Sequence, residues 1–180
     1  MKKKPKFNKE ATIRGALRRA FSRSPLVREV LEESRQEFPR YKKDGTRHKR
    51  NWVKRQCQVC NEWVGSSHIA VDHKDPVISV EHGKQDWNTF IDRLWCETSG
   101  KANLQRICDA CHDKKTHKEK IERLTKQYTE ELDCLEMDIK DGVGDSKTIK
   151  KQLAKYIAKK KTPDLEQIVQ RARDLKERLK

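Results

Sequence analysis

Four cysteines arranged as two short pairs are the residues whose type and spacing most clearly suggest chemistry. Cys57 and Cys60 form one Cys-x-x-Cys pair, and Cys108 and Cys111 form another later in the chain. Two residues between the thiolates allow a tight turn to direct both sulfur atoms at one ion. One such pair could equally be a redox site, but two matched pairs predict a structural zinc held by four thiolates.

Candidates for catalysis lie between the two cysteine pairs and directly after the second one. Asp72 and His73 are adjacent, Asn103 stands a few residues before the second pair, and His112 follows Cys111. Adjacent residues of a strand point to opposite faces, so Asp72 can bind a metal ion while His73 faces another partner, such as water. His112 would ordinarily be one more zinc ligand. Because four cysteines already complete a tetrahedral zinc, His112 is available for a second metal ion.

The charge of the chain predicts a polyanionic partner. Its formal net charge is +15, with 39% charged and 33% hydrophobic residues. Residues 1–56 hold 19 Lys and Arg against 6 Asp and Glu, residues 57–112 hold 5 against 8, and residues 113–180 hold 19 against 14. The cysteine-bearing middle is therefore the acidic part of a basic protein, as expected for a cation-binding centre between phosphate-binding surfaces. Solvated lysine-rich faces and a basic tail are the plainer alternative.

Composition also bears on the cellular compartment. No apolar run approaches the ~20 residues of a transmembrane helix, and the basic start of the chain lacks the apolar segment of a signal peptide. A cytoplasmic protein without membrane contact is therefore expected, and in that compartment paired cysteines favour metal binding over disulfides. Cys96 and Cys134 have no partner at the paired spacing and are expected to be ordinary thiols.

Short elements should position the first half of these residues. Helical spacing of apolar residues predicts one helix over residues 9–21 and a second over residues 25–38, with Ser24 as its N-cap. A short strand is expected before Cys57. Two further strands within residues 63–71 should form a hairpin around a Gly-Ser-Ser turn.

Helices should dominate the second half. A helix capped by Asp86 or Asn88 is expected in the connection that leads to the second cysteine pair. A long helix should start around Asp109, so that successive residues of its first turn point in different directions. Two more helices are expected, one capped by Ser146 and one by Thr162.

Taken together, these residues resemble the HNH endonuclease family, also called the ββα-metal or His-Me finger nucleases, in its zinc-stapled branch. The three letters of the family name match His73, Asn103 and His112. The motifs Asp-His-x-x-Pro, Asn-Leu-Gln and Cys-x-x-Cys-His-x-x-Lys-Thr occur in that order within residues 52–118. The N-terminal region also resembles phage-encoded members.

The resemblance implies a small α+β fold. Its core would be a ββα-metal, treble-clef-like unit stapled by zinc, with an N-terminal helical hairpin before it and a helical appendage after it. The corresponding division is a basic N-terminal region of residues 1–51, a nuclease core of residues 52–118 and a C-terminal extension of residues 119–180.

The resemblance also implies metal-dependent hydrolysis of DNA phosphodiester bonds, by nicking or by double-strand cleavage. His73 would be the general base, Asp72 and His112 would bind a catalytic Mg²⁺ or Mn²⁺, and Asn103 would hold the loop that orients His73. The four cysteines would bind Zn²⁺ for structure alone. The expected nucleic-acid contacts are five basic residues around this centre: Arg50, Lys54, Arg55, Arg106 and Lys115.

A second class of function stays open at this point, a non-catalytic zinc-stapled module that binds nucleic acid or protein. The complete set of Asp72, His73, Asn103 and His112 favours the enzyme, because a scaffold needs none of them. The C-terminal helices could form a homodimer or contact a phage or host protein. The expected location is the cytoplasm of an infected or host bacterial cell.

Overall fold

The two N-terminal helices begin at the caps that the sequence supplies. Helix α1 (Lys9–Phe21) starts after Asn8, and helix α2 (Pro25–Glu32) starts after Ser24. In each case the cap side chain accepts a hydrogen bond from an amide of the first turn, which has no partner within the helix. Both starts agree with the prediction. The computed structural model describes residues 7–83, 85–143, 145–158 and 165–179.

Helix α2 ends at Glu32 and not at Phe38, so the predicted length of this helix is wrong. Residues Gln36–Phe38 form strand β1, which pairs antiparallel with strand β2 (Trp52–Gln56). Phe38 lies opposite Trp52 in this register, and aromatic pairs across strands stabilise a sheet. Pairing with a distant strand therefore overrides the helical spacing of apolar residues in this segment.

Strand β2, predicted before Cys57, is the central strand of a sheet with the order β1-β2-β3. Strand β3 (Trp63–Gly65) is its second antiparallel neighbour. The predicted hairpin within residues 63–71 is wrong, because β3 and strand β4 (Ile69–His73) belong to different sheets. The 3₁₀ helix η1 (Ser66–His68) joins them without reversing the chain into a paired strand.

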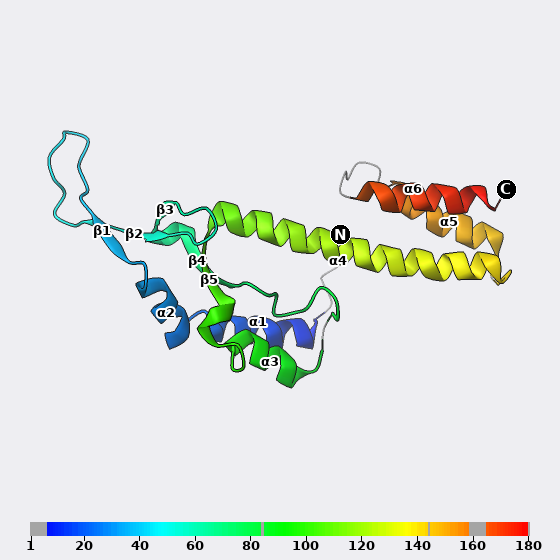
Figure 1. Ribbon diagram of the computed structural model, residues 1–180, viewed down its shortest axis with the longest axis horizontal. Helices are drawn as coiled ribbons and strands as arrows, with labels where there is room; N and C mark the ends of the chain where they lie inside the picture. Colours follow the sequence, from blue (N-terminus) through cyan, green and yellow to red (C-terminus); the bar gives the residue numbers. More distant parts are fainter. Residues whose placement is uncertain (1–6, 84, 144, 159–164, 180) are drawn as a thin grey trace. The chain divides into compact units, whose positions relative to one another are not determined.

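The second sheet pairs β4 with strand β5 (Leu104–Cys108) in antiparallel register, with His73 opposite Leu104. The connection between them contains helix α3 (Trp87–Trp95), capped by Asp86 as predicted, and the 3₁₀ helix η2 (Gly100–Asn103). Figure 1 shows β4 and β5 side by side, with helix α4 continuing directly from β5. The order β4, β5, α4 places the predicted site residues at the ends of neighbouring elements, such as His73 at the end of β4 and Cys108 at the end of β5.

The helices on one side of this sheet share an apolar core with it. Phe21 of α1, Val30 of α2, Leu94 of α3 and Leu104 of β5 are all buried in one cluster. Cys96, expected to be an ordinary thiol, is buried in the same cluster. The N-terminal helices and the β4–β5 sheet therefore form one folded body, because they bury their apolar side chains against each other.

Packing divides the chain into two compact units, residues 1–114 and residues 115–180. Helix α4 (Asp109–Lys140) starts where the sequence predicts and contributes its first turn to unit 1. The three-part division into residues 1–51, 52–118 and 119–180 stays a prediction.

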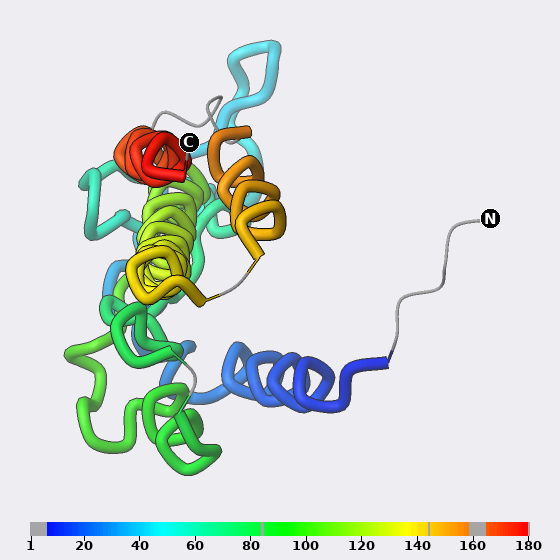
Figure 2. The backbone as a smooth tube through the Cα atoms, turned by 90° about the vertical axis from the view of Figure 1, so that its right-hand side faces the viewer, coloured from blue at the N-terminus to red at the C-terminus, as the bar shows by residue number. Residues whose placement is uncertain are grey.

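Unit 2 is built from helices, each contributing an apolar stripe to one core. The remainder of α4 packs with α5 (Ser146–Ile157) and α6 (Glu166–Glu177), which lie beside it in Figures 1 and 2. Leu132, Leu153 and Ala172, one from each helix, are fully buried in this core. The apolar stripes of these helices therefore close against one another within the chain.

The cap of α5 is one residue earlier than predicted. Asp145 accepts hydrogen bonds from the amides of Lys147 and Thr148, and Ser146 is the first helical residue. A carboxylate is favoured at this position because it faces the positive end of the helix dipole. Thr162, the predicted cap of the last helix, lies outside the described residues.

The described part of the chain contains six α-helices and two small antiparallel sheets, so the predicted α+β class is confirmed. Within the same residues, none of the helices combines the length and the apolar character that crossing a membrane requires.

Candidate metal centre

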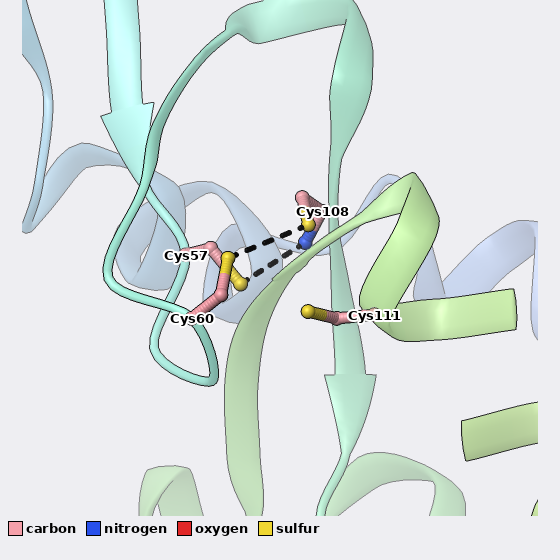
Figure 3. Close-up of side chains that lie close together, drawn as sticks. All are labelled: Cys57, Cys60, Cys108 and Cys111. Atoms are coloured by element: carbon pink, nitrogen blue, oxygen red, sulfur yellow. Dashed lines mark hydrogen bonds between the residues drawn. The ribbon is translucent and has the colours of Figure 1, made fainter. Parts of the chain in front are cut away.

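The four predicted cysteines lie together, as Figure 3 shows. Cys57 and Cys60 stand on the loop after β2, Cys108 ends β5, and Cys111 lies in the first turn of α4. Their four sulfur atoms are all within 4.8 Å of one another. This group is the one cluster of three or more potential metal-ligating side chains among the residues that the structure describes.

The spacing of the sulfur atoms fits a tetrahedral ion. The Cys60 and Cys108 sulfurs are 3.8 Å apart. Zinc–sulfur bonds of ~2.3 Å in a tetrahedron give sulfur–sulfur distances of ~3.8 Å, whereas a disulfide requires ~2 Å. Cys57, Cys60, Cys108 and Cys111 could therefore hold a metal ion such as zinc.

Backbone hydrogen bonds shape the two turns that carry the sulfurs. The amide of Asn61 donates to the Cys57 carbonyl at 2.9 Å, and Asn61 has a positive φ of 61°, which asparagine tolerates better than most residues. Gln58 joins the two turns, because its amide donates to the Arg106 carbonyl at 2.9 Å and its side chain accepts from the Arg106 amide at 2.8 Å. Both cysteine pairs are thus fixed relative to each other by main-chain contacts.

The thiols of the cluster differ in acidity. Burial raises the pKa of Cys57, but hydrogen bonds from the backbone amides of Cys60, Cys108 and Val59 outweigh burial and lower this pKa to about 6. A hydrogen bond with Cys108, followed by burial, raises the pKa of Cys111 to about 12. Thiolates this close repel one another, and a bound divalent cation is what allows all four to ionise.

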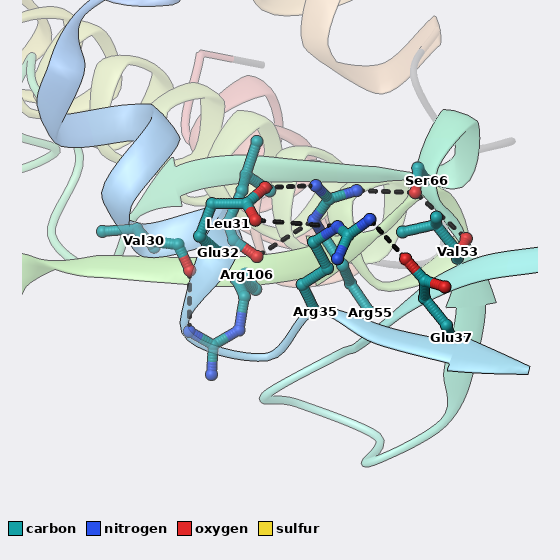
Figure 4. A network of polar contacts seen from close by, with 9 residues as sticks. All are labelled: Val30, Leu31, Glu32, Arg35, Glu37, Val53, Arg55, Ser66 and Arg106. Atoms are coloured by element: carbon teal, nitrogen blue, oxygen red, sulfur yellow. Dashed lines mark hydrogen bonds and ion pairs between the residues drawn. The ribbon is translucent and has the colours of Figure 1, made fainter.

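Two arginines connect the cysteine turns to helix α2. Arg55 donates to the Leu31 carbonyl at 2.9 Å and forms an ion pair with Glu32 at 2.8 Å. Figure 4 shows this guanidinium group at the C-terminal end of α2, together with Arg106 beside Val30. Cations at this end of a helix complement its dipole and bind its otherwise unpaired carbonyls.

Arg106 makes the same kind of contact from the other cysteine turn. It donates to the Val30 carbonyl at 2.9 Å and pairs with Glu33 at 2.9 Å. The side chains of Arg55 and Arg106 are only 12% and 11% exposed. Both were predicted to contact nucleic acid. That role stays a prediction, and in the structure both side chains contact the C-terminal end of α2.

The sequence contains a pattern that marks these two arginines and that the spacing of the cysteines alone does not reveal. Each cysteine pair is preceded by an arginine two positions earlier, so the pattern Arg-x-Cys-x-x-Cys occurs twice, at residues 55–60 and 106–111. Side chains two apart on a strand share a face, which places each arginine on a fixed side of its turn. Both strands therefore present an arginine to the same helix end.

Asp72 and His73 occupy the last two positions of β4. His73 is buried, with 7% of its surface exposed, and Asp72 is half-buried. Asp72 lies opposite Gln105, and Ala70 lies opposite Ile107, which packs in the cysteine cluster. Because side chains alternate along a strand, Asp72 lies on the sheet face of Ile107, and His73 lies on the opposite face, which Leu104 and the helical core share.

The ring of His73 is held on two sides. Its Nε2 lies 2.9 Å from the carbonyl oxygen of Leu94, in the last turn of α3. Its ring centroid is 5.0 Å from that of Phe21. Because a carbonyl can only accept, Nε2 carries the hydrogen, and in the neutral ring the lone pair is on Nδ1.

Asn103 contacts the loop directly after His73. Its side-chain oxygen accepts from the Asp75 amide at 2.9 Å, and its carbonyl accepts from the Lys74 amide at 2.6 Å. A side chain that binds the backbone of a neighbouring segment fixes where that segment leaves its strand. Asn103 is thereby joined to the end of β4 that carries His73.

The other predicted residues are placed as follows. His112 is half-buried next to Cys111 in the first turn of α4. Lys115 pairs with Glu119 at 3.2 Å, Arg50 is exposed, and Lys54 lies over aromatic rings of the first sheet. A second metal ion bound by Asp72 and His112 would have two protein ligands, and this site stays a prediction.

Comparisons of the chain with protein-family models, with curated proteins and with solved structures each gave no match. The resemblance to HNH nucleases therefore rests on the residues and their spacing.

Proposed function

We propose that this protein is a metal-dependent endonuclease of the HNH, or ββα-metal, type. The proposal is carried by one observation, the contact of His73 Nε2 with the Leu94 carbonyl. This hydrogen bond leaves the lone pair of the neutral ring on Nδ1, the form that a general base requires. The β4–β5–α4 order and the contact of Asn103 with the loop after His73 support the same assignment.

In this proposal each residue has one task. His73 takes a proton from the attacking water through Nδ1, while Leu94 and Phe21 keep its ring in place. When held by Asp72 and His112, Mg²⁺ or Mn²⁺ supplies positive charge to the scissile phosphate and the leaving oxygen. The predicted treble-clef-like staple is zinc bound by the four cysteines, which keeps β5 and the first turn of α4 in register with the preceding loop.

DNA is the proposed substrate class, because the chain carries a net charge of +15 and its first 56 residues hold 19 Lys and Arg. Neutralising phosphates releases condensed counterions, so affinity should fall steeply with added salt.

A non-catalytic zinc-stapled binding module is the second candidate. The observation in its favour is the burial of His73, since a histidine packed against Phe21 and bonded to a carbonyl can serve the fold alone. The two functions differ in whether removal of the imidazole affects cleavage or only stability.

The deciding experiment incubates supercoiled plasmid with the purified protein, with and without added Mg²⁺ or Mn²⁺. We expect nicking or linearisation that depends on the metal, and a loss of about 10²–10⁴-fold in rate for His73→Gln. Glutamine can still donate to the Leu94 carbonyl but cannot act as a base at neutral pH. His82→Ala is the matched control, because His82 is exposed and pairs with Glu81 at 3.7 Å.

Circular dichroism and zinc content are measured on each variant to separate catalysis from folding. A folded, zinc-loaded His73→Gln protein that cleaves as fast as the wild type would remove His73 from the base role. Binding of plasmid without any metal-dependent cleavage by the wild type would favour the binding module.

A further inference from the structure

The sheet β1-β2-β3 carries one aromatic residue from each strand on the same face. Phe38 of β1 lies opposite Trp52 of β2, and Trp63 of β3 lies opposite Gln56, four residues further along β2. The rings of Phe38 and Trp63 are 5.5 Å apart between centroids, at an interplanar angle of 62°. Because residues an even number apart on a strand share a face, the three rings lie on one face of the sheet.

This aromatic face is the outer one. The opposite face contains Arg55, whose side chain is directed to the end of α2 and is 12% exposed. Trp52, by contrast, is 54% exposed, while Phe38 and Trp63 are half-buried. A large aromatic surface that faces solvent is unfavourable in isolation and indicates a binding role when it lies within a patch of like side chains.

Cations lie over these rings. The ammonium of Lys54 is 5.1 Å from the Phe38 centroid and 5.4 Å from the Trp52 centroid. The guanidinium of Arg40 is 6.0 Å from the Trp52 centroid. Positive charge therefore lies directly over the aromatic face, within reach of the phosphate of a nucleotide bound there.

The loop between β1 and β2 extends this basic surface. This loop, residues 39–51, contains six Lys and Arg and one acidic residue, Asp44. Tyr41, which is 63% exposed, forms a bridge with Arg47, and Gly45 makes the turn with a φ of 81°. Asp44 accepts hydrogen bonds from the amide and the hydroxyl of Thr46, which gives the turn a defined shape.

We propose that the outer face of β1-β2-β3 binds an unpaired nucleic-acid strand, with bases stacked on Trp52 and its aromatic neighbours and phosphates paired with Lys54 and Arg40. Bases within a duplex already stack on each other, so rings on a protein surface can accept only bases that are unpaired. An acidic peptide would satisfy the cations but would leave the rings without a matching planar group. The combination of rings and cations therefore fits single strands best.

This inference shares with the proposed function only the assumption that the ligand is nucleic acid, and it requires no cleavage. Binding is measured without added divalent cation, so that the proposed hydrolysis does not occur. A protein that stacks single strands but never cleaves would overturn the nuclease proposal alone.

The test measures fluorescence anisotropy of a labelled oligothymidylate and of a labelled duplex, each titrated with the wild type, Trp52→Phe and Trp52→Leu. Leucine keeps an apolar side chain in the strand but cannot stack, whereas phenylalanine keeps a ring. We expect Trp52→Leu to weaken binding of the single strand about tenfold, the loss of about one stacked base. The affinity of Trp52→Phe for the single strand should stay within about threefold of the wild-type affinity.

Two further variants sharpen the result. Met137→Ala, which removes a side chain 57% exposed on α4, should leave both affinities unchanged. Lys54→Ala should weaken the binding of both ligands and reduce the salt dependence of the affinity by about one phosphate contact. If Trp52→Leu bound the single strand with wild-type affinity, or lost equal affinity for single strand and duplex, the proposal that bases stack on this face would be overturned.

Discussion

The two units of this protein are stabilised in different ways. Unit 2 has one continuous apolar core with leucines such as Leu132 and Leu153 fully buried. In unit 1, an apolar core of helices and the β4–β5 sheet lies beside a small separate cluster of Ile107 and the cysteines, where polar contacts of Arg55 and Arg106 hold the nearby helix end. Helices with regular apolar stripes can bury a core by packing against one another. Short strands and turns carry too few apolar side chains to do so and need further contacts.

The difference explains why the potential for chemistry lies in unit 1. A region shaped by a cysteine cluster and by hydrogen-bonded turns can hold polar side chains such as His73 and Asn103 in fixed positions. A core of packed helices gives stability but leaves few polar groups inside. The predictions below test whether the two kinds of stabilisation are separate.

The largest effect is expected for Cys57→Ser. Cys57 is fully buried, and its sulfur accepts hydrogen bonds from two amides, so a serine there loses both a metal ligand and a packed atom. Structural zinc contributes about 10–16 kcal/mol to the folding of small zinc domains. We therefore expect loss of bound zinc and of the ordered strands, with the helical signal of unit 2 retained in circular dichroism.

Cys134→Ser is the matched control, because Cys134 is exposed in unit 2 and lies outside the cysteine cluster. It should keep wild-type zinc content and thermal stability. If Cys57→Ser folded as well as the wild type with no zinc bound, the structural role of the cluster would be refuted.

The next effect is expected for Leu132→Ala in the core of unit 2. Leu132 is fully buried, and truncating such a residue costs about 2–5 kcal/mol because a cavity is left behind. The helical unfolding transition should move to lower denaturant concentration while zinc content stays at the wild-type level. Met137→Ala, on the exposed side of the same helix, should change stability by less than about 0.5 kcal/mol. Zinc lost in parallel with the helical transition would show that the units do not unfold separately.

A smaller effect is expected for Arg106→Ala. The guanidinium binds the Val30 carbonyl and Glu33, and hydrogen bonds of charged groups contribute about 1.5–3 kcal/mol. Because the Glu33 side chain is 48% exposed, solvent screening should reduce the loss to about 1–2 kcal/mol. Arg35→Ala, at a side chain that is 41% exposed, should cost less.

Thermal unfolding of the zinc-loaded protein measures both arginine variants. Arg106→Lys distinguishes charge from geometry, since lysine keeps the charge but has no planar fork of donors. Equal stability of Arg106→Ala and the wild type would mean that the contact of Arg106 with α2 does not stabilise the fold.

Sequence reasoning succeeded where local signals act alone. Asn8, Ser24 and Asp86 mark helix starts, because an N-cap depends only on the residues around it. The cysteine cluster was also predictable, since one ion imposes one geometry on Cys57 and Cys108 whatever lies between them.

Sequence reasoning failed where pairing with a distant strand determines the secondary structure of a segment. Phe38 continues the helical spacing of α2, yet it pairs with Trp52 across β1 and β2. The contacts of Arg55 and Arg106 with the end of α2 were likewise not predicted, because they depend on where the fold places that helix. Such tertiary contacts are not encoded by charge and spacing.

The smallest effect concerns the ion pairs of unit 2. Hydrogen bonds from Arg171 and then Arg178 hold the pKa of Glu136 below its ordinary value of 4.5. A carboxyl whose pKa is lowered by folding stabilises the protein above its unfolded pKa, and this contribution disappears as pH falls through the lower, folded value. The thermal stability of unit 2 should therefore decline as pH drops below 4.5, and Glu136→Gln should show a weaker decline. Because these side chains are largely exposed, added salt should diminish the difference between wild type and variant. An identical pH dependence for both proteins would show that these ion pairs contribute nothing to the helical unit.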